Sequence, residues 1–217
     1  MKTDVLQNLR RYWDTLRDGR LAPYRAELDP RKFEDALENM FILEQLNPTQ
    51  LRVRLAGMTL CEMMGMEVRG MPPEAFMAAD DREMFTTHLN TVLSKPSILE
   101  LDLTATGSDG NTTTGKMLLL PLRSDFGEVT RVLGCVLTEE EVTAAPVHFT
   151  INNFVSTEIN ITGSTEASTA LPGFAENAVP FRHVEASPVL RTVAGEGDAT
   201  RRSKPRRGHL RIVSDDE

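Results

Sequence analysis

The chain has 217 residues, of which 40% are hydrophobic and 26% are charged, so its length and composition suit one globular domain with an additional segment. No apolar run approaches the roughly 18 residues of a membrane helix, the N-terminus lacks the apolar stretch of a signal peptide, and two cysteines are too few for a disulfide framework. These features exclude membrane insertion and favour the cytoplasm, and the formal net charge of −8 opposes non-specific binding to nucleic acid.

Hydrophobic periodicity predicts the elements in the first half of the chain. Apolar residues recur at helical spacing in the first stretch, and Asp29 followed by Pro30 is typical of a helix start. A strand-like apolar run and an alternating run then flank a turn at Asn47-Pro48, which predicts an antiparallel hairpin. The predicted elements are helices over 3–17 and 31–37, strands over 40–46 and 51–55, and a short helix over 57–66.

The following residues combine short helices with three strands. Asp80-Asp81 favours a helix start through the helix dipole, and the run Ser-Asp-Gly-Asn at 108–111 is typical of a hairpin turn. Two strands, a helical crossing and a three-strand meander predict an α+β domain with short helices on one face of the sheet. The predicted elements are helices over 73–78 and 80–93 and strands over 98–106, 113–122 and 129–137.

Motifs spread over residues 8–140 carry a family resemblance. The run Phe-Ile-Leu-Glu at 41–44 and the later run Gly-Met-Glu-Val-Arg-Gly at 65–70 resemble the PAS pattern of a strand leading into a helix that ends in GxExxG. The first part is also similar to a PAS subfamily that is common in alphaproteobacteria and was first catalogued as a domain of unknown function. This resemblance implies a PAS fold, with a five-stranded antiparallel sheet, short helices on one face and an N-terminal helix. The residues that carry the subfamily resemblance are Trp13, Arg17, Pro23, Arg25, Asp29, Pro30 and the Arg-Leu-Ala-Gly run at 54–57.

Composition divides the chain into four parts: an N-terminal helix and linker (1–22), a PAS-like domain (23–142), an extra segment (143–161) and a disordered tail (162–217). Residues 162–200 hold few large apolar groups, so they cannot offset the entropy cost of ordering.

The extra segment has partial period-two spacing from residue 148 to residue 161. This spacing predicts either a hairpin that bends at Asn152-Asn153 or a strand that pairs only with a partner. The tail carries a basic block, Arg201–Arg207, which is a weak candidate for binding nucleic acid or anionic lipid, and a short terminal strand over 209–213.

PAS domains bind small molecules or partners between the sheet and the short helices, so the resemblance implies a candidate pocket there. Its predicted lining is rich in methionine, whose adaptable side chain suits either a plastic binding surface or simple core filling. The pocket candidates are Phe41, Leu43, Met58, Cys61, Met63, Met64, Phe85, His88, Leu101 and Leu119.

Two of these residues raise the question of a cofactor. His88 lies on the helix that supplies the axial histidine in haem-binding PAS sensors, but its neighbours also suit a core edge or a surface position. Cys61 lacks the flanking motif of the flavin-binding PAS light sensors. The cofactor is therefore unknown, and the sequence argues against both haem and flavin. It also contains no Walker loop, metal-ligand spacing or nucleophile motif, which indicates that the protein is not an enzyme.

Two further groups of residues are binding candidates. Three arginines flank the predicted pocket mouth, where they could clamp an anionic ligand or form ordinary surface ion pairs. The apolar stripe of the first helix could contact a second copy or a partner, or it could pack on the chain's own sheet. The anion-clamp candidates are Arg52, Arg54 and Arg69, and the dimer or partner candidates are Leu9, Tyr12, Trp13 and Leu16.

These observations predict a non-catalytic bacterial regulator that senses a small ligand or a partner and signals through protein–protein interaction. A shift of the short helices over the sheet would bias a binding surface. One alternative is a ligand-free interaction or adaptor module, and the other is an enzyme built on a PAS-like scaffold.

Overall fold

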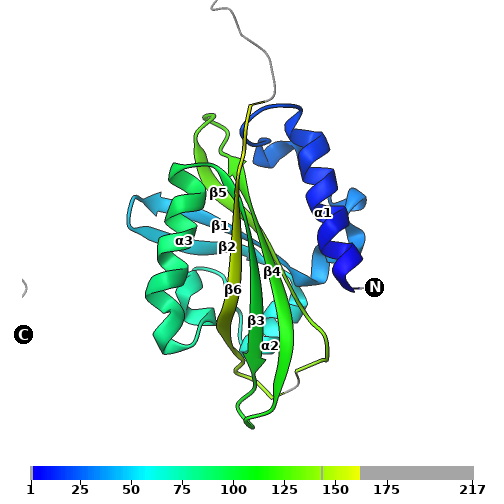
Figure 1. The fold of residues 1–217 in the computed structure, drawn as a ribbon, viewed down its shortest axis with the longest axis vertical. Coiled ribbons are helices and arrows are strands. Elements are labelled where there is room, and N and C mark those ends of the chain that lie inside the picture. The colour runs from blue at the N-terminus through cyan, green and yellow to red at the C-terminus, as the bar shows by residue number, and fades with distance from the viewer. Residues whose placement is uncertain (1, 143, 162–217) are drawn as a thin grey trace, which may run out of the picture. The chain divides into compact units, whose positions relative to one another are not determined.

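An antiparallel sheet of six strands, in the order β2-β1-β5-β4-β3-β6, forms the centre of the fold. The computed structural model describes residues 2–142 and 144–161 (Figure 1). None of the helices in these residues is long and apolar enough to span a membrane. The elements are α1 (Lys2–Arg17), η1 (Arg25–Glu27), η2 (Pro30–Lys32), η3 (Glu34–Asn39), β1 (Met40–Asn47), β2 (Gln50–Ala56), α2 (Met58–Met64), η4 (Pro73–Phe76), η5 (Ala79–Asp81), α3 (Arg82–Ser94), β3 (Ser97–Thr106), β4 (Thr112–Arg123), β5 (Val129–Thr138) and β6 (His148–Glu158), where η marks a 3-10 helix.

The element order confirms the predicted α+β class, with two differences. The helix predicted over 31–37 is replaced by η2 and η3, because the backbone of Phe33 leaves the helical region and its side chain is buried against the sheet. Asp29 does cap this region, since its Oδ1 accepts a hydrogen bond from the backbone N–H of Arg31 at 3.2 Å. The second difference is the sixth strand, β6, where five strands were predicted.

Side chains alternate between the two faces of the sheet and form a separate core on each face. The face covered by α2, η4 and α3 carries what we call the inner cluster. Its buried residues are Phe41, Leu43, Leu51, Val53, Leu60, Met63, Met64, Val68, Phe76, Met77, Phe85, Leu89, Val92, Leu93, Leu99, Leu101, Leu103, Ala105, Met117, Leu119, Val132, Val136, Val147 and Phe149.

The opposite face of the sheet carries the N-terminal helix α1, whereas α2, η4 and α3 lie together on the inner face (Figure 1). We call the buried core under α1 the outer cluster. Its residues are Leu9, Trp13, Ala22, Phe33, Ala36, Met40, Ile42, Ile98, Leu118, Leu120, Leu122, Leu133, Cys135 and Leu137.

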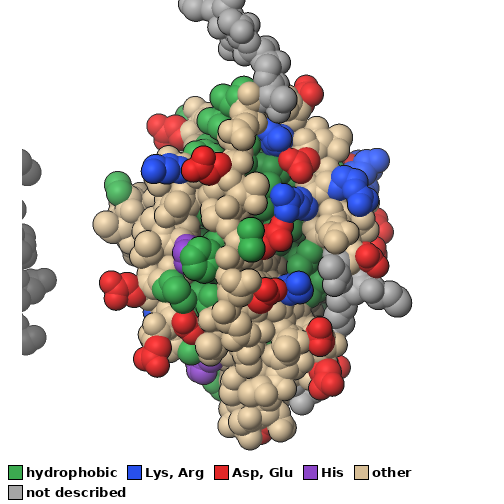
Figure 2. Space-filling view, viewed as in Figure 1, with side chains coloured by type: hydrophobic (Ala, Val, Ile, Leu, Met, Phe, Trp, Pro, Cys, Tyr) green, Lys and Arg blue, Asp and Glu red, His purple; other side chains and the backbone are tan. Residues whose placement is uncertain are grey.

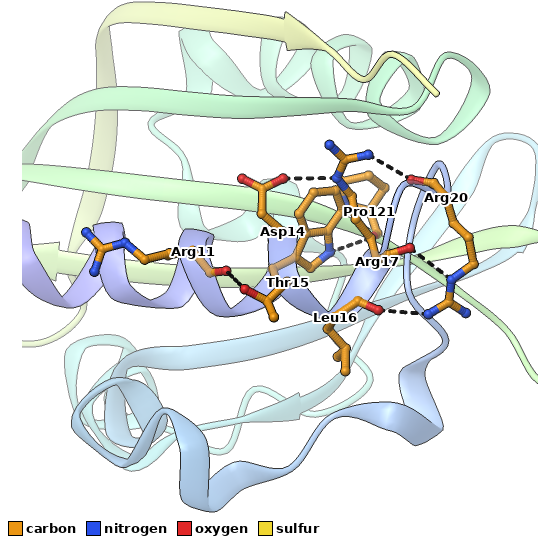
Figure 3. A network of polar contacts seen from close by, with 8 residues as sticks. Arg11, Asp14, Thr15, Leu16, Arg17, Arg20 and Pro121 are labelled. Atoms are coloured by element: carbon orange, nitrogen blue, oxygen red, sulfur yellow. Dashed lines mark hydrogen bonds and ion pairs between the residues drawn. The ribbon is translucent and has the colours of Figure 1, made fainter. Parts of the chain in front are cut away.

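Helix α1 is attached to the sheet mainly through its second half. Trp13 is fully buried, and its indole Nε1 donates to the carbonyl oxygen of Pro121 in β4 at 3.0 Å. Figure 3 shows how arginines then satisfy the free carbonyl groups at the end of the helix, since Arg20 donates to the carbonyls of Leu16 and Arg17 at 2.8 and 2.9 Å. These contacts fix where α1 ends and how it lies on the sheet.

Strand β6 corrects the prediction of a hairpin in the extra segment. It is one continuous strand, and it pairs with β3 from Ser97↔Glu158 to Thr106↔His148. Asn152 and Asn153 do not form a bend, because the irregularity at this point is a shift of one residue in the register opposite Asp102 and Leu103. The predicted tail, including the basic block and the strand over 209–213, lies outside the described residues.

Candidate functional site

The inner face brings together most of the predicted pocket residues. Seven of them are buried members of the inner cluster, and Cys61 packs against it while half-buried. Met58 is instead 69% exposed at the start of α2, so it does not line this site. The seven clustered residues are Phe41, Leu43, Met63, Met64, Phe85, Leu101 and Leu119.

His88 lies at the border of the inner face rather than within it. Its ring packs against Phe154 of β6 with the ring centroids 4.1 Å apart. Its Nε2 is buried and makes no hydrogen bond within the described part of the chain. Burial lowers the pKa of this imidazole, because the charged form loses hydration there.

Aromatic side chains occupy the centre of the inner face. The ring of Phe41 meets that of Phe76 edge to face, with centroids 6.1 Å apart. Gly134 of β5 lies directly beside the Phe41 ring, and a Cβ at this position would overlap it. The absence of a side chain at Gly134 therefore lets the ring of Phe41 lie against β5.

Sequence reasoning missed two aromatic residues that close this site. Phe76 belongs to the short helix η4, and Phe149 enters from β6, with both side chains fully buried. Phe149 is also tied to the helical side, because its carbonyl oxygen accepts from the backbone N–H of Ala78 at 2.9 Å. The apolar positions of the segment over 148–161 signalled burial on one side, but nothing in the sequence identified β3 as the neighbour.

The three anion-clamp candidates do not flank the inner face, because they extend from β2 and the following loop toward the opposite side. Arg52 is paired with Glu44, with Nη2 and Oε2 3.0 Å apart, and so corresponds to the surface ion pair that was the alternative. Arg54 and Arg69 instead line a pocket on the outer face together with Arg25 and Arg131. Its volume is about 360 Å³.

A second pocket on the outer face, of about 260 Å³, lies between Leu6 of α1 and strands β3 to β5. Charges of both signs balance each other beside it, since Lys116 pairs with Asp102 at 3.3 Å and Arg10 pairs with Glu100. Figure 2 shows acidic and basic side chains interspersed on this face, over β3 and β4. The pocket beside α1 therefore carries charges of both signs, whereas the arginine-lined pocket holds four arginines and a single carboxylate, that of Asp125.

The stripe of α1 that was a dimer candidate lies largely in the chain's own core. Leu9 and Trp13 are buried in the outer cluster. Tyr12 stacks on Phe33, and its hydroxyl oxygen accepts a hydrogen bond from the backbone N–H of Asp29 at 2.8 Å. The alternative in which this helix packs on its own sheet is the arrangement observed.

Comparison with known proteins agrees with this architecture. The PAS domain family model matches residues 1–137. The chain belongs to the PAS domain family. The part that matches ends one residue before β5 does, so β6 lies outside it.

Solved structures of other PAS domains resemble the chain at low identity. One is a light-oxygen-voltage (LOV) domain studied with a flavin analogue, at 17% identity over 51% of this chain and 84% of that one, with a TM-score of 0.40. The PAS domain of a Colwellia psychrerythraea protein has 12% identity over 52% and 96% of the two chains, with a TM-score of 0.37. The Rhodobacter sphaeroides LOV protein has 16% identity over 52% and 69%, with a TM-score of 0.39. At these TM-scores the similarity carries no argument of its own, and no curated protein matches the chain.

The placement of metal-ligating side chains and of the buried thiol can be described for this PAS domain. Within residues 2–142 and 144–161 there is no group of three or more His, Cys, Asp or Glu side chains placed to hold a metal ion. Cys135 is buried in the outer cluster, and burial raises the pKa of its thiol to about 12, which keeps it protonated and unreactive.

Proposed function

We propose that this PAS domain is a non-catalytic bacterial regulatory module that acts in the cytoplasm through contacts with a protein partner. The observation that carries the proposal is the inner cluster, where buried aromatic and methionine side chains lie between the sheet and the short helices, the place in which PAS domains hold ligands. Signalling then depends on changes in packing, which a partner or a weakly held ligand biases by binding one arrangement more tightly than another.

Helix α2 is the element that we expect to differ between the two arrangements. It has only seven residues, and its last turn places Met63 and Met64 against the sheet. The carbonyl oxygen of Met63 accepts a hydrogen bond from the backbone N–H of Val147 at 2.8 Å, which links α2 to the segment that leads into β6. Because methionine repacks at low cost, a shift of α2 can be transmitted to β6 and to the surface beside it.

The test compares Met63→Trp with Met58→Trp on the same helix, since Met63 is buried and Met58 is exposed. Both variants are checked for folding by circular dichroism, and the proteins that co-purify with each from the host are quantified by mass spectrometry. We expect Met63→Trp to change the amount of a specific bound partner while Met58→Trp does not. If both folded variants hold the same partners as the unchanged protein, the inner face does not control binding.

The many buried aromatic and methionine side chains of the inner cluster also favour the ligand-free form of this function, an adaptor without a small molecule. Native mass spectrometry of protein purified from its own host, with an absorbance spectrum of the same sample, separates the two forms. An adaptor has the mass of the bare chain and no band above the protein absorbance. An added mass, or a haem or flavin band, identifies a sensor and overturns the ligand-free form.

A further inference from the structure

The arginine-lined pocket lies on the outer face, away from the inner cluster, at the side of the sheet formed by β1 and β2. Four arginine side chains and a single carboxylate, that of Asp125, surround a floor made of Ile42 and Leu55. The pocket has a volume of about 360 Å³, which is in the range of small-molecule sites.

The backbone brings these arginines together from four different segments. A register shift between β1 and β2 leaves Arg54 as an extra residue between Val53 and Leu55, so that Arg54 and Leu55 line the same pocket rather than opposite faces. The backbone N–H of Gly70 donates to the carbonyl oxygen of Val53 at 2.8 Å, which holds the loop that contains Arg69 beside β2.

The other two arginines come from the β5 side of the pocket. Arg131 lies on β5 next to β1, where its register partner is Glu44. The segment before Arg25 is fixed by a hydrogen bond of 2.8 Å from the backbone N–H of Arg123 to the carbonyl oxygen of Pro23. All four arginines therefore stand on backbone that is hydrogen-bonded to the sheet or is part of it.

The protein neutralises only part of the charge in this pocket. Arg131 shares Glu44 with Arg52, at 3.6 and 3.0 Å. Arg25, Arg54 and Arg69 form no side-chain ion pair with any residue that the structure describes. A chain with a net charge of −8 has ample carboxylates, yet it places three arginines here without a partner.

We propose that this pocket binds a small ligand that carries a phosphate group, with its apolar part against Ile42 and Leu55. Guanidinium groups are planar, permanently charged and present paired donors that match phosphate oxygens, so several of them around one pocket select phosphate over a single carboxylate. The acidic surface of the whole chain opposes long polyanions such as nucleic acid, whereas a compact ligand meets only the local positive charge. The site is independent of the partner binding proposed above.

The test is isothermal titration calorimetry of the full chain with inorganic pyrophosphate. The double variant Arg54→Gln/Arg69→Gln removes two unpaired charges from the pocket. The matched control, Arg11→Gln/Lys95→Gln, changes the net charge by the same amount at exposed residues outside it. We expect the pocket variant to weaken binding by about tenfold or more, because hydrogen bonds between charged groups contribute most of the affinity, and the control to bind like the unchanged chain.

An NMR titration of the unchanged chain locates the site. Amide shifts confined to residues around Arg54, Arg69 and Arg131 support the proposal. Equal weakening in both double variants, shifts spread over the other face, or no heat of binding with the unchanged chain would overturn it.

Discussion

Gly134 shows how a single residue determines what the inner face can hold. Because a Cβ at this position would overlap the ring of Phe41, Gly134→Ala forces the ring away from β5. Overpacking of this kind costs about 1–3 kcal/mol. We therefore expect the free energy of unfolding of Gly134→Ala, measured by urea denaturation, to fall by about that amount.

The control for this prediction is a double-mutant cycle with Phe41→Leu. The smaller side chain removes the overlap, so Gly134→Ala should cost much less in the Phe41→Leu background. An equal cost in both backgrounds would show that the alanine acts on the strand itself rather than on the aromatic ring.

Single residues also show what sequence reasoning could reach at the candidate site. The alternation predicted over 98–106 agrees with the buried position of Leu101 in the inner cluster, because strand periodicity fixes which side a residue faces. Alternation could not place Leu55, because the register shift in β2 breaks the pattern and brings Leu55 into the arginine-lined pocket beside Arg54. A shift of this kind depends on the neighbouring strand, which a single sequence does not reveal.

At the scale of elements, β6 contributes to the core through one residue and leaves another at the surface. Phe149 is 0% exposed in the inner cluster, whereas Phe154 is 45% exposed beside His88. Truncation of a buried phenylalanine costs about 3–5 kcal/mol, so Phe149→Ala should lower the free energy of unfolding by that order. Phe154→Ala should lower it by far less, since its side chain is 45% exposed and belongs to neither core cluster.

Urea denaturation of Phe149→Ala and Phe154→Ala measures the difference between their free energies of unfolding. Both variants make the same chemical change in the same strand, so they control for each other. Similar losses would contradict the placement of Phe149 in the core. A large loss for Phe154→Ala alone would show that β6 is held mainly by its contact with α3.

Most elements followed from periodicity and turn residues, but β6 and the region after α1 did not. Asn152-Asn153 has the composition of a bend, yet ten pairings with β3 outweigh that local preference and leave only a register shift. The sequence from 31 to 37 has helix-start residues, but burial of Phe33 divides it into η2 and η3. In both places tertiary contacts override local propensity.

At the scale of the whole molecule, the sequence predicted the α+β class but not the two-sided arrangement of helices. The apolar stripe of α1, with Leu9 and Trp13, requires a surface to cover, and periodicity does not say whether that surface belongs to the same chain or to a second copy. The structure places the stripe on the chain's own sheet, which adds the outer cluster as a second core.

Chemical labelling of Cys135 measures the free energy needed to expose the outer cluster, in which its thiol is buried. Its thiol is buried under α1 and has a pKa of about 12, so a thiol reagent can modify it only when the structure opens. In a Cys61→Ala variant at native pH, we expect the free energy of opening obtained from labelling to equal the global free energy of unfolding from denaturation. Labelling that is much faster than global unfolding would show that α1 detaches from the sheet on its own.

The edge position of β6 has a consequence during synthesis on the ribosome. β5 ends at Thr138 and β6 at Glu158. At about 5–20 residues per second, the nascent chain takes about 1–4 s to grow from the first point to the second. Throughout that interval the backbone edge of β3 is open to non-native strand pairing, although every strand of the PAS domain itself has been made.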